Sequence, residues 1–164
     1  MAETPVATSE AGRWIVVGGR RWRATDPAIP GPLRQELVDE LMSARRAVKA
    51  REDGARDRVD DAKRALGERG YPWWEDPTTD ELDRRSRATI HALVRKRSES
   101  SICPSDVARI VGGDGESWRR RMPDVRRVAA DMARQGEVVI TQKGNVVDLD
   151  ETRGPVRISR GPAL

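Results

Sequence analysis

The sequence predicts a mostly helical α+β protein, and three features of the chain support this fold class. Residues 101–160 follow the order helix, helix, strand, long turn, strand. Two short strands flank Gly18-Gly19, a dipeptide that suits the tight turn of a β-hairpin. Two amphipathic helices flank Asp53-Gly54 and are expected to form an antiparallel helical hairpin.

A basic helix lies in the middle of residues 101–160. Its apolar stripe repeats at helical spacing over Trp118, Met122, Val125, Ala129 and Met132. Pro123 interrupts this stripe, and proline is tolerated in a first helical turn but not in a helix interior. We therefore predict a short turn over residues 117–121, followed by a helix that begins at Pro123 and ends at Gly136.

The elements around this helix complete a recognisable order. A shorter helix precedes it, with Pro104 at the first helical position and Asp106 near the positive end of the helix dipole. Thr78 and Glu81 have capping-box spacing for a still earlier helix that runs to about Lys96. Residues 138–141 and 156–158 have strand patterns, and residues 98–102 offer a short first strand. This order predicts a winged helix-turn-helix domain with residues 143–153 as its wing.

The N-terminal half has a separate pattern. The hairpin register places Ile15 opposite Trp22, a pair suited to a core face, and Trp14 opposite Arg23, a pair suited to cation–π stacking. Pro32 opens the first helix, and the second spans about residues 55–69 with Gly70 as its stop. Trp73-Trp74 is expected to pack against these helices, the alternative being an exposed binding motif.

We divide the chain into four parts. These are a disordered tail over 1–12, the β-hairpin and helical hairpin region over 13–76, the winged-helix domain over 77–160 and a frayed tail over 161–164. Asp76-Pro77-Thr78 is the expected linker.

Composition narrows the classes of function. Equal numbers of acidic and basic residues occur in 1–76, so the whole formal charge of +4 belongs to 77–164 and favours an anionic partner. One cysteine excludes an internal disulfide. No apolar run approaches the roughly 20 residues that span a membrane, and residues 1–12 lack a signal-peptide core. We expect a cytoplasmic protein with no membrane partner.

Basic residues of the middle helix and the wing form the predicted nucleic-acid site. They are Arg119, Arg120, Arg121, Arg126, Arg127, Arg134, Lys143 and Arg153. In a winged helix the second helix of the turn enters the major groove, and the wing touches phosphates. These residues predict a small DNA-binding or DNA-associated regulator with duplex DNA as its partner.

The alternative is a protein–protein interaction adaptor that binds no nucleic acid. Asp124 and Asp131 interleave with the arginines and offer them ion pairs on a solvated helix face. Arginines that are buried or paired with acidic residues would favour the adaptor. A continuous positive face across the helix and the wing would favour DNA.

No pattern of catalytic residues is present, so we expect no enzyme activity, no cofactor and no small-molecule substrate. His91 and Cys103 are single copies, whereas a zinc site needs about four ligands, or three plus water. Cys103 is expected to be a small buried residue, the alternative being a reactive thiol at a helix N-terminus. Gly112-Gly113-Asp114-Gly115 lacks the Lys-Ser/Thr of a phosphate-binding loop.

The C-terminal half resembles a bacterial family known as the domain of unknown function three-two-five-three. The resemblance rests on Ile102-Cys103-Pro104-Ser105-Asp106-Val107-Ala108-Arg109, Trp118, Met122-Pro123, Val125-Arg126, Thr141-Gln142-Lys143-Gly144, Val147-Asp148 and Arg153-Gly154-Pro155-Val156-Arg157. It implies a winged-helix-like fold and nothing catalytic.

The N-terminal half resembles short actinobacterial proteins of unknown activity that are sometimes labelled biopolymer transporters. The matching runs are residues 19–27, 40–42, 44–48, 65–70 and 72–74. The membrane segments that a transporter needs are missing from this sequence, so the label is not adopted.

Overall fold

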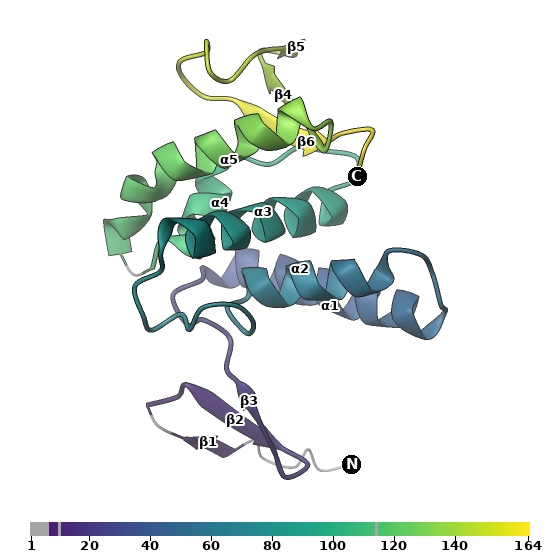
Figure 1. Ribbon diagram of the computed structural model, residues 1–164, viewed down its shortest axis with the longest axis vertical. Helices are drawn as coiled ribbons and strands as arrows, with labels where there is room; N and C mark the ends of the chain where they lie inside the picture. The colour runs from purple at the N-terminus through teal and green to yellow at the C-terminus, as the bar shows by residue number, and fades with distance from the viewer. Residues whose placement is uncertain (1–6, 10, 114) are drawn as a thin grey trace.

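The computed structural model describes residues 7–9, 11–113 and 115–164 and has an α+β fold (Figure 1). The helices are α1 (Gly31–Lys49), α2 (Ala55–Ala65), α3 (Thr79–Lys96), α4 (Pro104–Val111) and α5 (Met122–Arg134), with a 3₁₀ helix η1 (Gly115–Arg121). The strands are β1 (Ala7–Ser9), β2 (Trp14–Val17), β3 (Arg20–Arg23), β4 (Val138–Gln142), β5 (Asn145–Val146) and β6 (Arg157–Arg160). Along the long axis of Figure 1, α1 and α2 separate the N-terminal sheet from α3, and α5 lies beside the C-terminal sheet.

The N-terminal sheet has the order β1-β2-β3 and is antiparallel. The predicted register is confirmed, with Ile15 opposite Trp22 and Trp14 opposite Arg23. The predicted cation–π stacking of Arg23 on Trp14 is wrong. The guanidinium of Arg23 donates to the carbonyl of Gly70 at 2.8 Å, and the diagonal neighbour Arg21 stacks on Trp14, 4.2 Å from the ring centroid.

Two further expectations about this sheet differ from the structure. Trp22 was expected on a core face, but its residue is 41% exposed. Residues 7–9 were expected to belong to a disordered tail over 1–12, but they form β1 and pair with β2. Residues 1–6 and residue 10 of the same predicted tail lie outside the described residues.

The helical hairpin is formed by α1 and α2, which pack against each other as predicted. The apolar stripe of α1 buries Leu33, Leu37 and Leu41. α2 ends at Ala65 rather than near Arg69, because Gly67 supplies the stop three residues before Gly70. Gly67 has φ of +78°, and an added Cβ would lie 3.0 Å from the Cβ of Asp26, so glycine is required there.

α3 is the central helix, and it packs on α1 and α2 with one side and on α4 and α5 with the other. A continuous cluster of buried side chains runs from Leu37 on α1 through Leu93 on α3 to Met132 on α5. Thr78 and Glu81 form the predicted capping box at the N-terminus of α3. The domain boundary predicted near Asp76 falls in the loop before α3 and stays a prediction. The helices before this loop, α1 and α2, and the helices after it contribute side chains to the same buried cluster.

An ion pair between α1 and the end of α3 reinforces the interface. Arg97 donates from Nε and Nη2 to the two carboxylate oxygens of Glu36, at 2.7 and 2.8 Å. This hydrogen bonding lowers the pKa of Glu36 below its usual value. A carboxylate with a lowered folded-state pKa adds stability above its unfolded pKa and loses that contribution as pH falls through the folded value.

Glu36→Gln should therefore cost about 1 kcal/mol at pH 7, since partial exposure of the pair limits its strength. The difference from the wild type should begin to shrink below the unfolded pKa of about 4.3, and should approach zero only at a pH below the lowered folded-state pKa of Glu36, where the wild-type carboxylate is also neutral. Urea unfolding at both pH values measures it. Glu99→Gln, an exposed site without a hydrogen bond to any described residue, is the matched control. A cost that persists undiminished at low pH would contradict this account.

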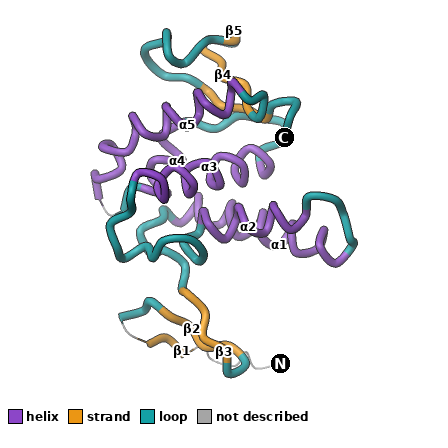
Figure 2. Tube along the Cα trace, viewed as in Figure 1, coloured by secondary structure: helices purple, strands orange, loops and turns teal. Residues whose placement is uncertain are grey.

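The C-terminal elements follow the predicted order. The second sheet is antiparallel with the order β5-β4-β6, and Ile140 lies opposite Ile158. The short first strand expected over residues 98–102 is reduced to a single bridge between Ile102 and Ile158. The loop that follows β5 carries most of residues 143–153, the predicted wing, and we keep the name wing for these residues (Figure 2). Residues 161–164 were expected to fray, but the N–H groups of Gly161 and Ala163 donate to the carbonyls of Glu137 and Gly136, in the connection between α5 and β4.

Within the described residues, no helix combines the length and the apolar character that a membrane crossing requires.

Candidate interaction surfaces

α5 is held by the face that the sequence predicts. Val125, Ala129 and Met132 are fully buried, and Pro123 lies in the first turn after η1. Arg127 and Arg134 are exposed, and Asp131 is half-buried. The helix therefore presents its basic residues outward, and their partners decide what this face can bind.

Acidic residues pair with several of the predicted nucleic-acid contacts. Arg127 donates to both carboxylate oxygens of Asp83 at 2.8 Å and to Asp124 at 3.3 Å. These bonds, chiefly that to Asp83, raise the pKa of Arg127. Arg134 donates to Asp150 in the wing at 2.7 Å. Arg119 pairs with Glu116 on η1.

Arg126 holds the end of the wing, and the residue that follows it, against α5. Its guanidinium donates to the carbonyl of Thr152 at 3.0 Å and to that of Gly154 at 3.3 Å. Gln142, at the end of β4, donates from its side-chain amide to the carbonyls of the two residues that each follow one of these, Arg153 at 2.7 Å and Pro155 at 3.2 Å. The wing also carries Asp148, Asp150 and Glu151, all exposed. Carboxylates therefore lie beside Arg119, Arg127 and Arg134 and along the wing.

Four of the predicted contacts keep their side chains unpaired. Arg120, Arg121, Lys143 and Arg153 form no side-chain hydrogen bond or ion pair with the part of the chain that the structure describes. The first two precede α5 and the others lie in the wing. The structure therefore places the predicted residues on two adjoining elements but divides them into paired and unpaired groups.

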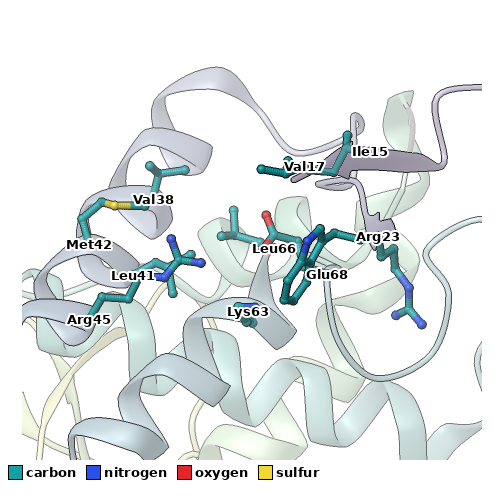
Figure 3. A pocket seen from close by; sticks show the side chains of 11 residues that line it. Ile15, Val17, Arg23, Val38, Leu41, Met42, Arg45, Lys63, Leu66 and Glu68 are labelled. Atoms are coloured by element: carbon teal, nitrogen blue, oxygen red, sulfur yellow. The ribbon is translucent and has the colours of Figure 1, made fainter. Parts of the chain in front are cut away.

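A second surface, which the sequence reasoning missed, is a groove in the N-terminal half (Figure 3). We call it the apolar groove. Its volume is about 420 Å³, and its walls come from the sheet on one side and α1 on the other. The apolar lining consists of Ile15, Val17, Trp22, Val38, Leu41, Met42 and Leu66. The one sequence signal for it was Trp22, which was assigned to the core.

The rim of the apolar groove is basic. Lys63 lies over the ring of Trp22, with Nζ 5.1 Å from its centroid, and burial lowers the pKa of this lysine. Arg45 lies on the α1 wall, and neither cation forms an ion pair within the described residues. The carboxylate that lines the groove, Glu68, accepts a hydrogen bond from Thr25 at 2.8 Å.

Cys103 and His91 each lie against charged side chains. The half-buried thiol of Cys103 accepts a hydrogen bond from Nη1 of Arg157 at 2.6 Å. The ring of His91 lies between carboxylate oxygens of Asp61, at 3.3 Å, and Glu137, at 3.5 Å. Among the residues described, no group of three or more His, Cys, Asp or Glu side chains is arranged to hold a metal ion.

The comparison with known families concerns the part of the chain from α3 to β6. Residues 83–161 match DUF3253, a family described as protein of unknown function. The DUF3253 match supports the resemblance of the C-terminal half, and the resemblance of the N-terminal half stays a prediction. No curated protein matches the chain. The description of DUF3253 assigns no activity, so function has to be argued from the two surfaces above.

Proposed function

We propose that this chain is a non-enzymatic protein–protein interaction adaptor with a winged helix-turn-helix at its C-terminal end. The winged-helix assignment is supported by the order α3, bridge at Ile102, α4, α5, β4, wing and β6. α4 and α5 then correspond to the helix-turn-helix, and α5 is the helix that DNA-binding relatives of this architecture place in the major groove.

The observation that carries the proposal is the pairing of the basic face with carboxylates. DNA carries about one negative charge per 1.7 Å of helix axis, so a docked duplex would meet Asp83, Asp150 and Glu151 along with the arginines. Arg127 and Arg134 would exchange existing carboxylate partners for phosphates, which limits the gain. A protein surface that alternates both signs of charge suits this face better.

The four unpaired cations favour a second candidate function, which is DNA binding. Arg120 and Arg121 precede the N-terminal end of α5, where helix-turn-helix proteins contact base edges, and Lys143 and Arg153 lie in the wing. If these four side chains neutralised phosphates, the logarithm of the binding constant would fall with the logarithm of salt with a slope of about −3 to −4.

Fluorescence anisotropy with a labelled mixed-sequence duplex at low salt tests the proposal. We expect no binding at tens of micromolar protein, roughly the range of weak non-specific DNA binding. DNA binding with the slope above would overturn the adaptor proposal. In that case Arg120→Ala/Arg121→Ala should flatten the slope by about two. Arg127→Ala/Arg134→Ala removes the same charge from carboxylate-paired sites and is the matched control.

A further inference from the structure

We propose that the apolar groove binds an acidic amphipathic helix of a partner protein. The inference rests on the proposed adaptor function and deepens it, since it names the docking surface and the chemistry of the partner. It uses the N-terminal half, away from the face of α5 that the DNA experiment tests.

The first argument is the exposed apolar surface. Val17, Trp22 and Met42 are 48%, 41% and 39% exposed, and the first two line the groove from the sheet whereas Met42 lines it from α1. They account for three of the five large hydrophobic side chains that are exposed in the described part of the chain. Exposed apolar residues scattered singly need no explanation, but apolar residues gathered around a groove mark an interaction site.

The second argument is shape, which favours a helix as the occupant. Val38, Leu41, Met42 and Arg45 run along two turns of α1, a length of about 10 Å. A helix that lies along this wall presents apolar side chains at i, i+3 or i+4 and i+7, about one turn apart, and so two or three of them face the groove. A strand added to the edge of β3 would pair with a four-residue strand that carries three arginines and would leave the groove unfilled.

The third argument is charge complementarity, which makes the partner acidic. Lys63 and Arg45 lack ion-pair partners within the described residues, and the guanidinium carbon of Arg20 lies 5.0 Å from the centroid of the Trp22 ring. Partial burial disfavours the charged form of Lys63, and a carboxylate beside it would remove that penalty. Burial lowers the pKa of Lys63 by more than the charge of Glu68 raises it, so a further carboxylate would still stabilise the charged lysine. A basic helix would meet like charge at the rim.

Anisotropy with designed peptides tests this inference on the full chain. The probe is a fluorescein-labelled amphipathic peptide, long enough to be helical at about 15 residues, with Leu on one face and Glu on the other. The comparison peptide carries Lys at every Glu position. We expect saturable binding of the Glu peptide and at least tenfold weaker binding of the Lys peptide.

Three variants locate the binding. Met42→Glu places a charge on the apolar wall and should weaken the Glu peptide at least tenfold. Arg45→Glu/Lys63→Glu should weaken the Glu peptide by a similar factor and strengthen the Lys peptide. Arg46→Glu makes one of the same charge changes at an exposed α1 position outside the groove and should leave binding within twofold. Circular dichroism confirms that each variant is folded.

Equal binding of the two peptides, or a Glu peptide that Met42→Glu does not weaken, would overturn the inference. So would saturable binding of dodecanoate without the peptide, which indicates a small-molecule pocket. A dimer that Met42→Glu dissociates, with no peptide binding, would instead assign the groove to a second copy of the chain. Each of these outcomes without DNA binding leaves the adaptor function standing, whereas DNA binding overturns that function independently.

Discussion

Asp26→Ala should lower the free energy of unfolding by about 3–5 kcal/mol, because it leaves a charged arginine buried without its carboxylate. Nη2 of Arg85 donates to Oδ2 of Asp26 at 3.0 Å, and the two residues are only 5% and 4% exposed. The same guanidinium also donates to the hydroxyl of Tyr71 and to the carbonyls of Ala65 and Ile110. One side chain of α3 is therefore bonded to both halves of the chain.

Urea unfolding followed by circular dichroism measures the loss. The double variant Asp26→Ala/Arg85→Met should be milder than the single one, because removal of both partners leaves no buried charge. It also removes Nε of Arg85, which is buried without a hydrogen-bond partner in the described structure. Asp80→Ala breaks the exposed pair with Arg84 and should cost less than about 1 kcal/mol. A double variant as unstable as Asp26→Ala would contradict this explanation.

Met132→Ala is the second large effect and should cost about 2–5 kcal/mol. Met132 is fully buried between α5 and the rest of the core, so the truncation removes apolar contacts and leaves a cavity. Arg127→Ala, on the opposite face of the same helix, should cost no more than about 1 kcal/mol despite its pair with Asp83, because that pair is solvent-exposed. Urea melts of both variants give the comparison. The reverse ranking would mean that the packing face of α5 is wrong.

Local sequence signals predicted the C-terminal half closely. Pro123 correctly located the start of α5, Pro104 the start of α4, and the Thr78/Glu81 spacing a capping box that forms as predicted. Such signals act within a few residues, so one sequence is enough to read them. The Ile15–Trp22 register was found for the same reason, because a two-residue turn fixes the pairing of its strands.

Features that depend on contacts between residues far apart in the chain were not predicted from the sequence. Gly67 and Gly70 both have positive φ and both suit a helix stop, and the sequence alone does not distinguish them. The ion pair of Arg127 with Asp83 joins residues 44 positions apart. No local pattern in the sequence distinguishes Arg85 from an exposed arginine, and it is buried because α3 lies in the centre of the fold. The apolar groove likewise forms from three segments that carry no common pattern.

The hydrogen bonds that hold residues 152–155, at the end of the wing, have a consequence for the evolution of this segment. Arg126 and Gln142 hold the carbonyl groups of four successive residues, 152–155, in alternation. Every amino acid has a carbonyl, so the path of this segment is independent of most side chains it carries. Gly154 is the exception, because its φ of +86° disfavours other residues. The outward side chains of this segment can therefore vary among homologues, and with them the molecules that the segment contacts, while the backbone hydrogen bonds to Arg126 and Gln142 are kept.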